Sequence, residues 1–245
     1  MLSAETMRGP TNGFCFGILG GMGPRATVDF FLKLIEATPA VVDRDHIPVV
    51  VYSVPQVPDR TEAILHGGPS PVNELRRGIQ TLENAGASVI VVACNTAHYW
   101  FDEMQKSAGV PLLHIVDAAI DELQRVTRSA ARIGLMGTSG TITSDVYGRR
   151  LAQAGFQSVV PYPEDQEDVD RGIALVKAGR SEEGAAHFRR VLDTLIARGA
   201  SAIVLACTEI PVALPAENLS VPIVDATAAL ARYSVRYWRC SADTA

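Results

Sequence analysis

Two cysteines at the ends of similar segments are the residues of this chain best suited to chemistry. Residues 86–96 read GASVIVVACNT and residues 199–209 read GASAIVLACTE, so seven of eleven positions are identical. Cys94 and Cys207 hold the same place in the two segments. A thiolate can accept a proton and a thiol can donate one, so a matched pair of cysteines is equipped for acid–base chemistry.

Each cysteine is predicted to lie at the carboxyl end of a buried strand. A near-continuous apolar run precedes both, which is typical of strands covered on both faces of a parallel sheet. In open α/β sheets, ligands bind beyond these strand ends. Residues that can open a helix follow each thiol, namely Asn95 and Thr96 after the first and Thr208 and Glu209 after the second. Because a helix N-terminus stabilises a thiolate, we expect both thiols to have a pKa below the free value of about 8.5.

Further pairs of segments indicate that the whole chain is a duplication. Residues 17–23 (GILGGMG) match residues 134–140 (GLMGTSG) at an offset of 117, and VP followed by IVD occurs within both 110–117 and 221–225. Each half of about 110 residues is too small to be generously stable alone. We therefore expect two halves that pack together about a pseudo-two-fold axis.

Strand and helix patterns alternate along the chain. Five apolar runs predict parallel strands at residues 15–19, 48–53, 88–93, 131–136 and 201–206. One helix is predicted from Ser70, the N-cap before Pro71, to a stop at Gly86, and another between Ser181 and Gly199. Strand, helix and strand in this order indicate right-handed crossovers.

This pattern predicts an α/β fold of two similar parallel-sheet domains, with the active site in the cleft between them. The first domain comprises residues 1–116 and is completed by residues 226–245, and the second comprises residues 117–225. The pseudo-two-fold axis would set Cys94 and Cys207 on opposite walls of the cleft. Inverting a stereocentre by proton transfer needs a base on one face of a planar intermediate and an acid on the other. A thiolate facing a thiol would supply both, and the roles would exchange for the opposite enantiomer.

The composition excludes several classes of partner. The 245 residues include 22 Lys and Arg against 27 Asp and Glu, a net charge of −5, and 47% are apolar, as in a globular protein with an ample core. The chain offers no basic footprint for nucleic acid or an anionic membrane, and no apolar run of the roughly 18 residues that suggest a membrane span. A small anionic ligand would therefore have to find local cations.

The cysteine content points to a reducing compartment. Residues 1–11 lack the apolar stretch of a secretory signal and are expected to form a short extension. Four cysteines without a CxxC pair argue against a disulfide framework and for reduced thiols in the cytoplasm. Cys15 and Cys240 are expected to be small buried hydrophobic residues. A disulfide between the other two cysteines stays open as an oxidation product.

The sequence gives little support for a metal site or a cofactor site. Cys94 and His98 stand four residues apart, which could suit zinc, but Pro211 holds the equivalent place in the second half and no further cluster completes four ligands. Residues 21–26 (GMGPRA) spell a dinucleotide-binding turn, yet no acidic residue follows the next strand and Pro24 removes a backbone donor. None of the three lysines stands out as a Schiff-base residue for pyridoxal phosphate. We therefore predict neither a metal nor a cofactor.

Five motifs of the chain resemble those of the cofactor-independent aspartate racemases, a branch of the aspartate/glutamate racemase superfamily. They are GILGGMGP at 17–24, PQVPDR at 55–60, ACNTAH at 93–98, RGI with KAG within 171–179, and ACTEI at 206–210. The resemblance runs from about Phe14 to Tyr233, nearly the whole chain. In glutamate racemases the second cysteine motif usually reads Cys-Thr-His, whereas Glu209 stands at the place of that histidine here.

The resemblance implies a racemase that interconverts L- and D-aspartate without a cofactor and that forms a homodimer. It makes Cys94 and Cys207 the two catalytic thiols, one for each face of the substrate. Seven further residues are predicted to bind substrate or tune the thiols: Met22 in the pocket wall, Arg60 and Lys177 as cations for the carboxylates, Asn95, Thr96 and Thr208 as donors at helix N-termini, and Glu209 as the neighbour that orients the second thiol.

Alternatives within and outside the superfamily stay open. The chain could be another two-cysteine member, such as a glutamate or hydantoin racemase, because aspartate and glutamate differ by one methylene, worth only ~1–3 kcal/mol in a fitted pocket. Single-thiol relatives, such as decarboxylases or cis–trans isomerases, are disfavoured by the presence of both cysteines. A non-catalytic carboxylate-binding sensor on the same fold would keep the thiols only for packing.

Overall fold

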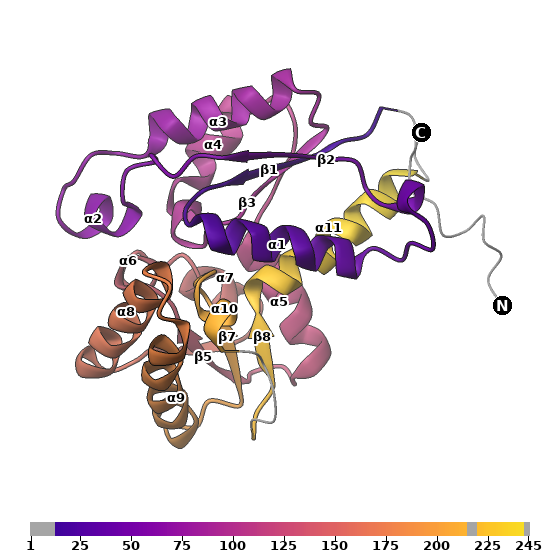
Figure 1. Cartoon of the computed structure of the whole chain (residues 1–245). Helices are drawn as coiled ribbons and strands as arrows, with labels where there is room; N and C mark the ends of the chain where they lie inside the picture. The colour runs from indigo at the N-terminus through magenta and orange to yellow at the C-terminus, as the bar shows by residue number, and fades with distance from the viewer. Residues whose placement is uncertain (1–12, 215–219, 243–245) are drawn as a thin grey trace, which may run out of the picture.

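The computed structural model describes residues 13–214 and 220–242, and the predicted N-terminal extension lies outside them. The described chain forms two parallel β-sheets, each covered by helices (Figure 1). We refer to the elements around the first sheet as the first half and to those around the second sheet as the second half.

The two sheets have the same strand order. The first half contains β1 (Phe16–Gly20), β2 (Val49–Ser53), β3 (Val89–Val92) and β4 (Leu112–Leu113) in the order β2-β1-β3-β4. The second half contains β5 (Arg132–Met136), β6 (Gln157–Val159), β7 (Ala202–Leu205) and β8 (Ile223–Asp225) in the order β6-β5-β7-β8. All neighbouring strands pair in parallel. The duplicated parallel-sheet α/β fold predicted from the sequence is thus confirmed.

Helices connect the strands and cover the sheets. In the first half they are α1 (Pro24–Ala37), η2 (Asp43–Asp45), α2 (Arg60–Leu65), α3 (Val72–Asn84), η3 (Thr96–Trp100) and α4 (Phe101–Ser107), where η marks a 3₁₀ helix. The second half has α5 (Ile115–Val126), α6 (Ser139–Thr143), α7 (Gly148–Gln153), α8 (Pro163–Lys177), α9 (Ser181–Ala197) and α10 (Ile210–Ala213), and α11 (Ala226–Ala242) ends the described chain.

Both helices predicted in detail are present. Helix α3 starts one residue later than predicted, because Pro71 and not Ser70 is the residue that precedes its first turn. It ends before Gly86, whose φ of 90° is in the left-handed region that glycine tolerates best. Helix α9 likewise ends before Gly199, with a φ of 86°. The two helix ends predicted from these glycines are therefore confirmed.

Three strands were not predicted, and all three are short. Strands β4, β6 and β8 have two or three residues each, and all three are edge strands. In β6 two of the three side chains are exposed, so the apolar run that identified the central strands is missing there. Burial on both faces, which produces that run, is found at the centre of each sheet.

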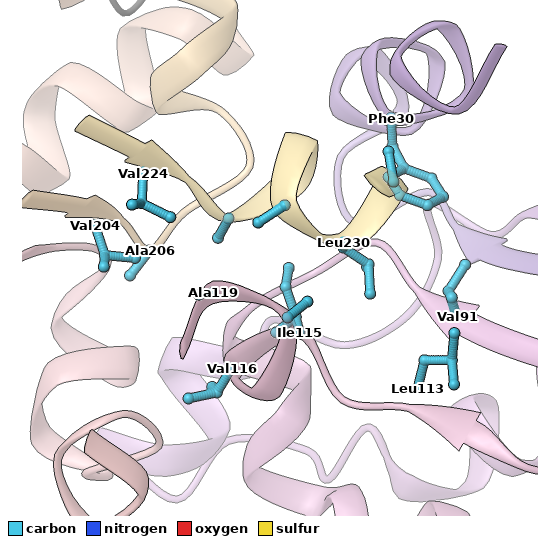
Figure 2. Close-up of a cluster of buried hydrophobic side chains, with 14 of the residues drawn as sticks. Phe30, Val91, Leu113, Ile115, Val116, Ala119, Val204, Ala206, Val224 and Leu230 are labelled. Carbon is cyan, nitrogen blue, oxygen red and sulfur yellow. The ribbon is translucent and has the colours of Figure 1, made fainter. Parts of the chain in front are cut away.

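One hydrophobic core joins the two halves. It contains side chains from both sheets, including Val91 of β3 and Val204 of β7 (Figure 2). Figure 2 shows Leu230 of α11 and Ile115 of α5 lying between these strands. Helix α11 packs against both α1 and α5. The halves are thus held by shared apolar burial, while the domain boundaries at residues 116–117 and 225–226 stay a prediction.

The four cysteines are all free thiols, but they differ in exposure. Cys94 and Cys207 are buried, Cys15 is partly exposed and Cys240 is exposed. The expectation that Cys15 and Cys240 are small buried residues is wrong, because Cys15 lies just before the first residue of β1 and Cys240 lies in the last turn of α11. Within the described residues, none of the helices combines the length and the apolar composition that crossing a bilayer requires.

Candidate active site

The two buried cysteines line one small cavity between the halves. Cys94 follows β3 and Cys207 follows β7, and their side chains are only 4% and 5% exposed. The cavity has a volume of about 20 Å³, and its walls are Met22, Asp59, Arg60, Thr61, Cys94, Asn95, Thr96, Thr138, Lys177, Cys207, Thr208 and Glu209. All nine residues predicted from the sequence are among these. The structure therefore brings the whole predicted set together at the carboxyl ends of both sheets.

The inner cavity adjoins a larger one. The outer cavity has a volume of about 590 Å³ and shares Met22, Asp59, Arg60, Lys177 and Glu209 with the inner one. The inner cavity has room for about one water molecule, so an amino acid can enter only if its walls move apart. Helix α2 of the first half packs against α6 of the second half beside it.

Glycine permits this close approach of α2 and α6. A Cβ atom added to Gly140 on α6 would lie 2.8 Å from Oγ1 and 3.0 Å from Cα of Thr61 on α2. Such distances are too short for non-bonded atoms, so any larger residue at position 140 would push the helices apart. The narrow inner cavity therefore depends on a glycine in the second half that faces the first half.

Arg60 is held rigidly beside the cavity. Its side chain is 9% exposed, and Nη1 donates hydrogen bonds to the carbonyl oxygens of Val57 (3.2 Å) and Pro58 (3.1 Å), while Nη2 donates to that of Met22 (3.3 Å). Among the described residues, its buried Nε atom has no hydrogen-bond partner. The guanidinium is thus fixed in place with one donor still available to a ligand.

Charge around Arg60 comes from both thiol and carboxylate groups. Burial lowers the pKa of Arg60, but the negative charges of Cys94 and Asp59 outweigh this effect and leave its pKa raised. Burial raises the pKa of Asp59, yet backbone N–H donors together with Arg60 and Lys177 leave that pKa lowered. Asp59 also caps α2, because Oδ1 accepts from the first two backbone N–H groups that follow Arg60 (2.8 and 3.0 Å). Cys94 therefore lies beside a permanent cation.

Lys177 supplies a second cation from the other half. It is the last residue of α8, it is exposed, and it lines both the inner and the outer cavity. Its charge also opposes the rise in the pKa of Cys207. An anionic ligand in the cavity would thus meet one buried and one exposed cation, in an otherwise acidic chain.

Cys207 is hydrogen-bonded to a carboxylate. Its Sγ donates to Oε2 of Glu209 (3.1 Å), and Oγ1 of Thr208 donates to the same oxygen (3.2 Å). Oε1 of Glu209 accepts from the backbone N–H of Gly23 in the first half (3.0 Å). Glu209 therefore orients the thiol and is itself oriented by the opposite half.

The expected fall in the pKa of Cys207 is wrong. Burial raises its pKa well above the ordinary value, and the negative charge of Glu209 raises it further. The following helix, α10, has four residues and begins only at Ile210, so its dipole is too short to outweigh these effects. The raised pKa favours the protonated thiol of Cys207, in contrast to the expectation that both thiols would be acidified.

Three threonines meet across the boundary between the halves. Oγ1 of Thr96 lies 3.0 Å from Oγ1 of Thr138 and 2.9 Å from Oγ1 of Thr141, and the last two are 3.0 Å apart. Thr138 lines the inner cavity and was not predicted. It falls in the glycine turn of residues 134–140, which repeats the turn containing Met22, so the repeat could have identified it.

Asn95 is oriented by a tyrosine that the sequence analysis missed. The hydroxyl of Tyr147 donates to Oδ1 of Asn95 (2.6 Å). Among the described residues, Nδ2 of Asn95 is buried without a partner. Tyr147 shows no motif or spacing that connects it with Asn95, because only the packing of the two halves brings them together. Asp59 and Thr61, which also line the cavity, flank Arg60 and were likewise not predicted.

His98 forms hydrogen bonds to the backbone beside Cys94. Its Nδ1 lies 2.8 Å from the carbonyl oxygen of Cys94, and Nε2 accepts from the backbone N–H of Ile115 (3.2 Å). Burial lowers the pKa of His98 to about 4, so the ring is neutral and Nδ1 carries its proton. Both nitrogens are thus engaged, and no cluster of three His, Cys, Asp or Glu residues in the described chain is arranged for a metal ion.

Comparison with known proteins identifies one family of racemases. The sequence profile of the family described as Asp/Glu/Hydantoin racemase matches residues 19–233. The broad specificity amino-acid racemase RacX of Bacillus subtilis (strain 168) is 31% identical over 227 residues, which cover 89% of this chain and 96% of that protein.

Solved structures agree with this match. The aspartate racemase of Picrophilus torridus has a TM-score of 0.81 and 33% identity, and the alignment covers 93% of this chain and 99% of the other. Glutamate racemase from Aquifex pyrophilus has a TM-score of 0.59 and 19% identity over 91% of this chain and 84% of its own, and thus shares the fold.

Proposed function

We propose, since the chain belongs to the Asp/Glu/hydantoin racemase family, that it interconverts L- and D-aspartate by proton transfer at Cα between two thiols, without a cofactor. The observation that carries this proposal is the shared cavity, in which Cys94 and Cys207 come from opposite halves. We also expect a cytoplasmic homodimer.

The surroundings of the thiols suggest which of them acts first as the acid. Cys207 donates its proton in a hydrogen bond to Glu209, and Cys94 lies beside the Arg60 cation, so we take Cys207 as the acid and Cys94 as the base in one direction. In one direction the Cys94 thiolate removes the α-proton and the electron pair of the C–H bond stays on Cα and the carboxylate. The Cys207 thiol then delivers its proton to the opposite face of Cα and becomes a thiolate. The reverse reaction exchanges these roles.

Substrate binding uses the donors that surround the thiols. The α-carboxylate gains negative charge as the proton leaves, so donors already in place lower the barrier. Nδ2 of Asn95 and the hydroxyl of Thr96 are proposed to bind this group, and Thr208 adds a further donor. Arg60 and Lys177 are proposed to bind the side-chain carboxylate.

The remaining proposed residues shape or adjust the site. Met22 forms part of the wall and holds Arg60 through its carbonyl oxygen. Glu209 accepts the proton of Cys207 in a hydrogen bond and can receive it when Cys207 has to act as the base. All nine residues named from the sequence thus have a place in the proposed reaction.

A racemase of broader specificity is the second candidate. The outer cavity of about 590 Å³ adjoins the inner one and gives room for side chains larger than that of aspartate. The similarity to a broad specificity amino-acid racemase supports the same alternative. In that case aspartate would be one of several substrates, and glutamate would be the nearest of the others.

Isotope exchange tests the proposed function. The protein is incubated with a panel of L- and D-amino acids in heavy water, and deuterium at Cα and loss of circular dichroism are followed. Aspartate is expected to exchange and racemise fastest. If none of the amino acids exchanged its α-proton, the proposal would be contradicted. A non-catalytic carboxylate-binding protein would then be the remaining interpretation.

Replacing Arg60 tests the choice of aspartate. The variant Arg60→Ala should raise the KM for aspartate at least about tenfold more than the KM for alanine, because a charged hydrogen bond is worth roughly 1.5–3 kcal/mol. Equal changes for the two substrates would show that Arg60 does not bind the side-chain carboxylate.

A further inference from the structure

Tyr147 reaches the site from inside the protein core. Its side chain is 1% exposed and packs in the hydrophobic core that joins the halves. It immediately precedes α7 of the second half, whereas Asn95 immediately precedes η3 of the first half. The 2.6 Å hydrogen bond between them therefore connects two residues that are 52 positions apart and belong to opposite halves.

This hydrogen bond decides which end of the Asn95 amide faces the cavity. A side-chain amide has an acceptor oxygen and a donor nitrogen at nearly the same distance from the backbone, so it needs a partner to define its orientation. The tyrosine hydroxyl donates to Oδ1. Burial raises the pKa of Tyr147, so the hydroxyl keeps the proton that it donates. The nitrogen is left for another partner.

The amide nitrogen has no such partner within the described protein. Asn95 is 2% exposed, it lines the inner cavity, and its Nδ2 is buried without a hydrogen bond. A buried, unpaired N–H₂ group is unfavourable, and a ligand with an acceptor oxygen would relieve this cost. A carboxylate has only acceptors and suits this donor.

We infer that Tyr147 is a positioning residue that holds the Asn95 amide with its nitrogen toward the α-carboxylate of the substrate. The inference rests on the proposed function. It also means that recognition of the carboxylate by the first half requires the second half to be in contact, because the hydroxyl that sets the amide comes from there.

A change of Tyr147 to Phe tests this role. Without the hydroxyl the amide can rotate by 180° and present its oxygen, which repels a carboxylate but accepts from a carboxamide. The KM for L-aspartate should rise about tenfold. The Ki of the α-carboxamide of aspartate, measured as a competitive inhibitor, should change by less than about twofold. A merely structural loss would weaken both ligands equally.

A tyrosine outside the site supplies the matched control. Tyr162 is exposed and its ring contacts the guanidinium of Arg198 (3.8 Å to the ring centroid). Tyr162→Phe removes the same hydroxyl and should change neither the KM nor the Ki. Equal weakening of both ligands by Tyr147→Phe, or no change in the KM, would overturn the inference.

A double variant keeps the test open if Tyr147→Phe does not fold. Asn95→Ala removes the acceptor, so no unpaired buried oxygen remains when Tyr147→Phe is added to it. The KM of the double variant should equal that of Asn95→Ala, because Tyr147 acts through Asn95. A further rise in the double variant would overturn the inference. Absence of racemisation in the wild-type protein would instead reject the proposed function.

Discussion

The two halves share their fold, yet they place different charged side chains beside their thiols. Both sheets have the same strand order, and in each a buried cysteine follows the third strand in sequence. Beside Cys94 lies the guanidinium of Arg60, whereas beside Cys207 lies the carboxylate of Glu209. Duplication thus produced a symmetric scaffold, and divergence of a few neighbours made the electrostatics asymmetric.

This asymmetry matters because a two-base reaction needs one thiolate and one thiol at the same time. Identical surroundings would favour the same state at both sulfurs. The halves also orient each other: Gly23 of the first half holds Glu209, and Tyr147 of the second half holds Asn95. Protonation and binding are therefore properties of the assembled pair of halves.

Replacing either thiol should have the largest effect. Cys94→Ser and Cys207→Ser keep the size of the side chain but remove a usable acid or base, so racemisation of aspartate should fall about 10²–10⁴-fold. Circular dichroism of the amino acid measures the rate. Cys240→Ser changes an exposed thiol and serves as the control, with unchanged activity expected.

Isotope exchange then separates the two sulfurs. The thiol that remains in each variant reaches only one face of Cα, so it should exchange the α-proton of one enantiomer faster than that of the other. The preferred enantiomer should be opposite in the two variants. Near wild-type racemisation in either variant would falsify the two-base mechanism.

The region around Cys94 should be sensitive to acid through His98. Its folded pKa of about 4 lies below the ordinary value of 6.5, so the unfolded chain binds more protons between these values. The free energy of unfolding should be highest above pH 6.5 and should fall as the pH drops toward 4. His98 alone should account for roughly 3 kcal/mol of this fall. Burial also lowers the pKa of His114, which acts in the same direction. In the second half Pro211 holds the equivalent place and cannot titrate.

Urea denaturation at several pH values measures this effect. The loss of stability between pH 6.5 and 4 should be smaller in His98→Gln than in the wild type, whatever the stability of the variant at pH 7. His66→Gln changes an exposed histidine and should leave the pH dependence as it is. An unchanged slope in His98→Gln would show that His98 is not the group that titrates.

Much of the fold was predictable because its central strands are buried on both faces. The runs before Cys94 and Cys207 are apolar for that reason, and the repeat between them revealed the duplication. The short strand β6 carries exposed polar residues and gave no such pattern. Local sequence thus predicts the central strands and the apolar edge strand β2, and it misses the short edge strands β4, β6 and β8.

The site was predictable where residues lie next to the cysteines or in recognised motifs. Asn95 follows Cys94 directly, Glu209 is the second residue after Cys207, and all nine predicted residues line the inner cavity. Tyr147 and Thr141 were missed because their contacts cross between the halves and depend on how these pack. The raised pKa of Cys207 was missed because its burial among side chains of the second half and the charge of Glu209 outweigh the effect of a short helix.

Removing the charge of Glu209 should give the smallest effect and the sharpest test of the asymmetry. Glu209→Gln keeps the shape and an oxygen that can accept from Cys207, but it removes one of the causes that raise the pKa of that thiol. In the active form of the free enzyme, the two thiols together hold one proton. This form disappears when the second thiol also ionises. A lower pKa of Cys207 should therefore move the alkaline limb of the kcat/KM profile to lower pH and reduce kcat/KM at a pH on that limb.

The shift must be the same for both enantiomers, because L- and D-aspartate have equal free energy and their kcat/KM values must stay equal. Glu62→Gln, which changes an exposed carboxylate on α2, should leave the limb in place. If the alkaline limb of Glu209→Gln is unchanged or moves to higher pH, the charge of Glu209 does not raise the pKa of Cys207. The opposite surroundings of the two sulfurs would then have no part in keeping one of them protonated.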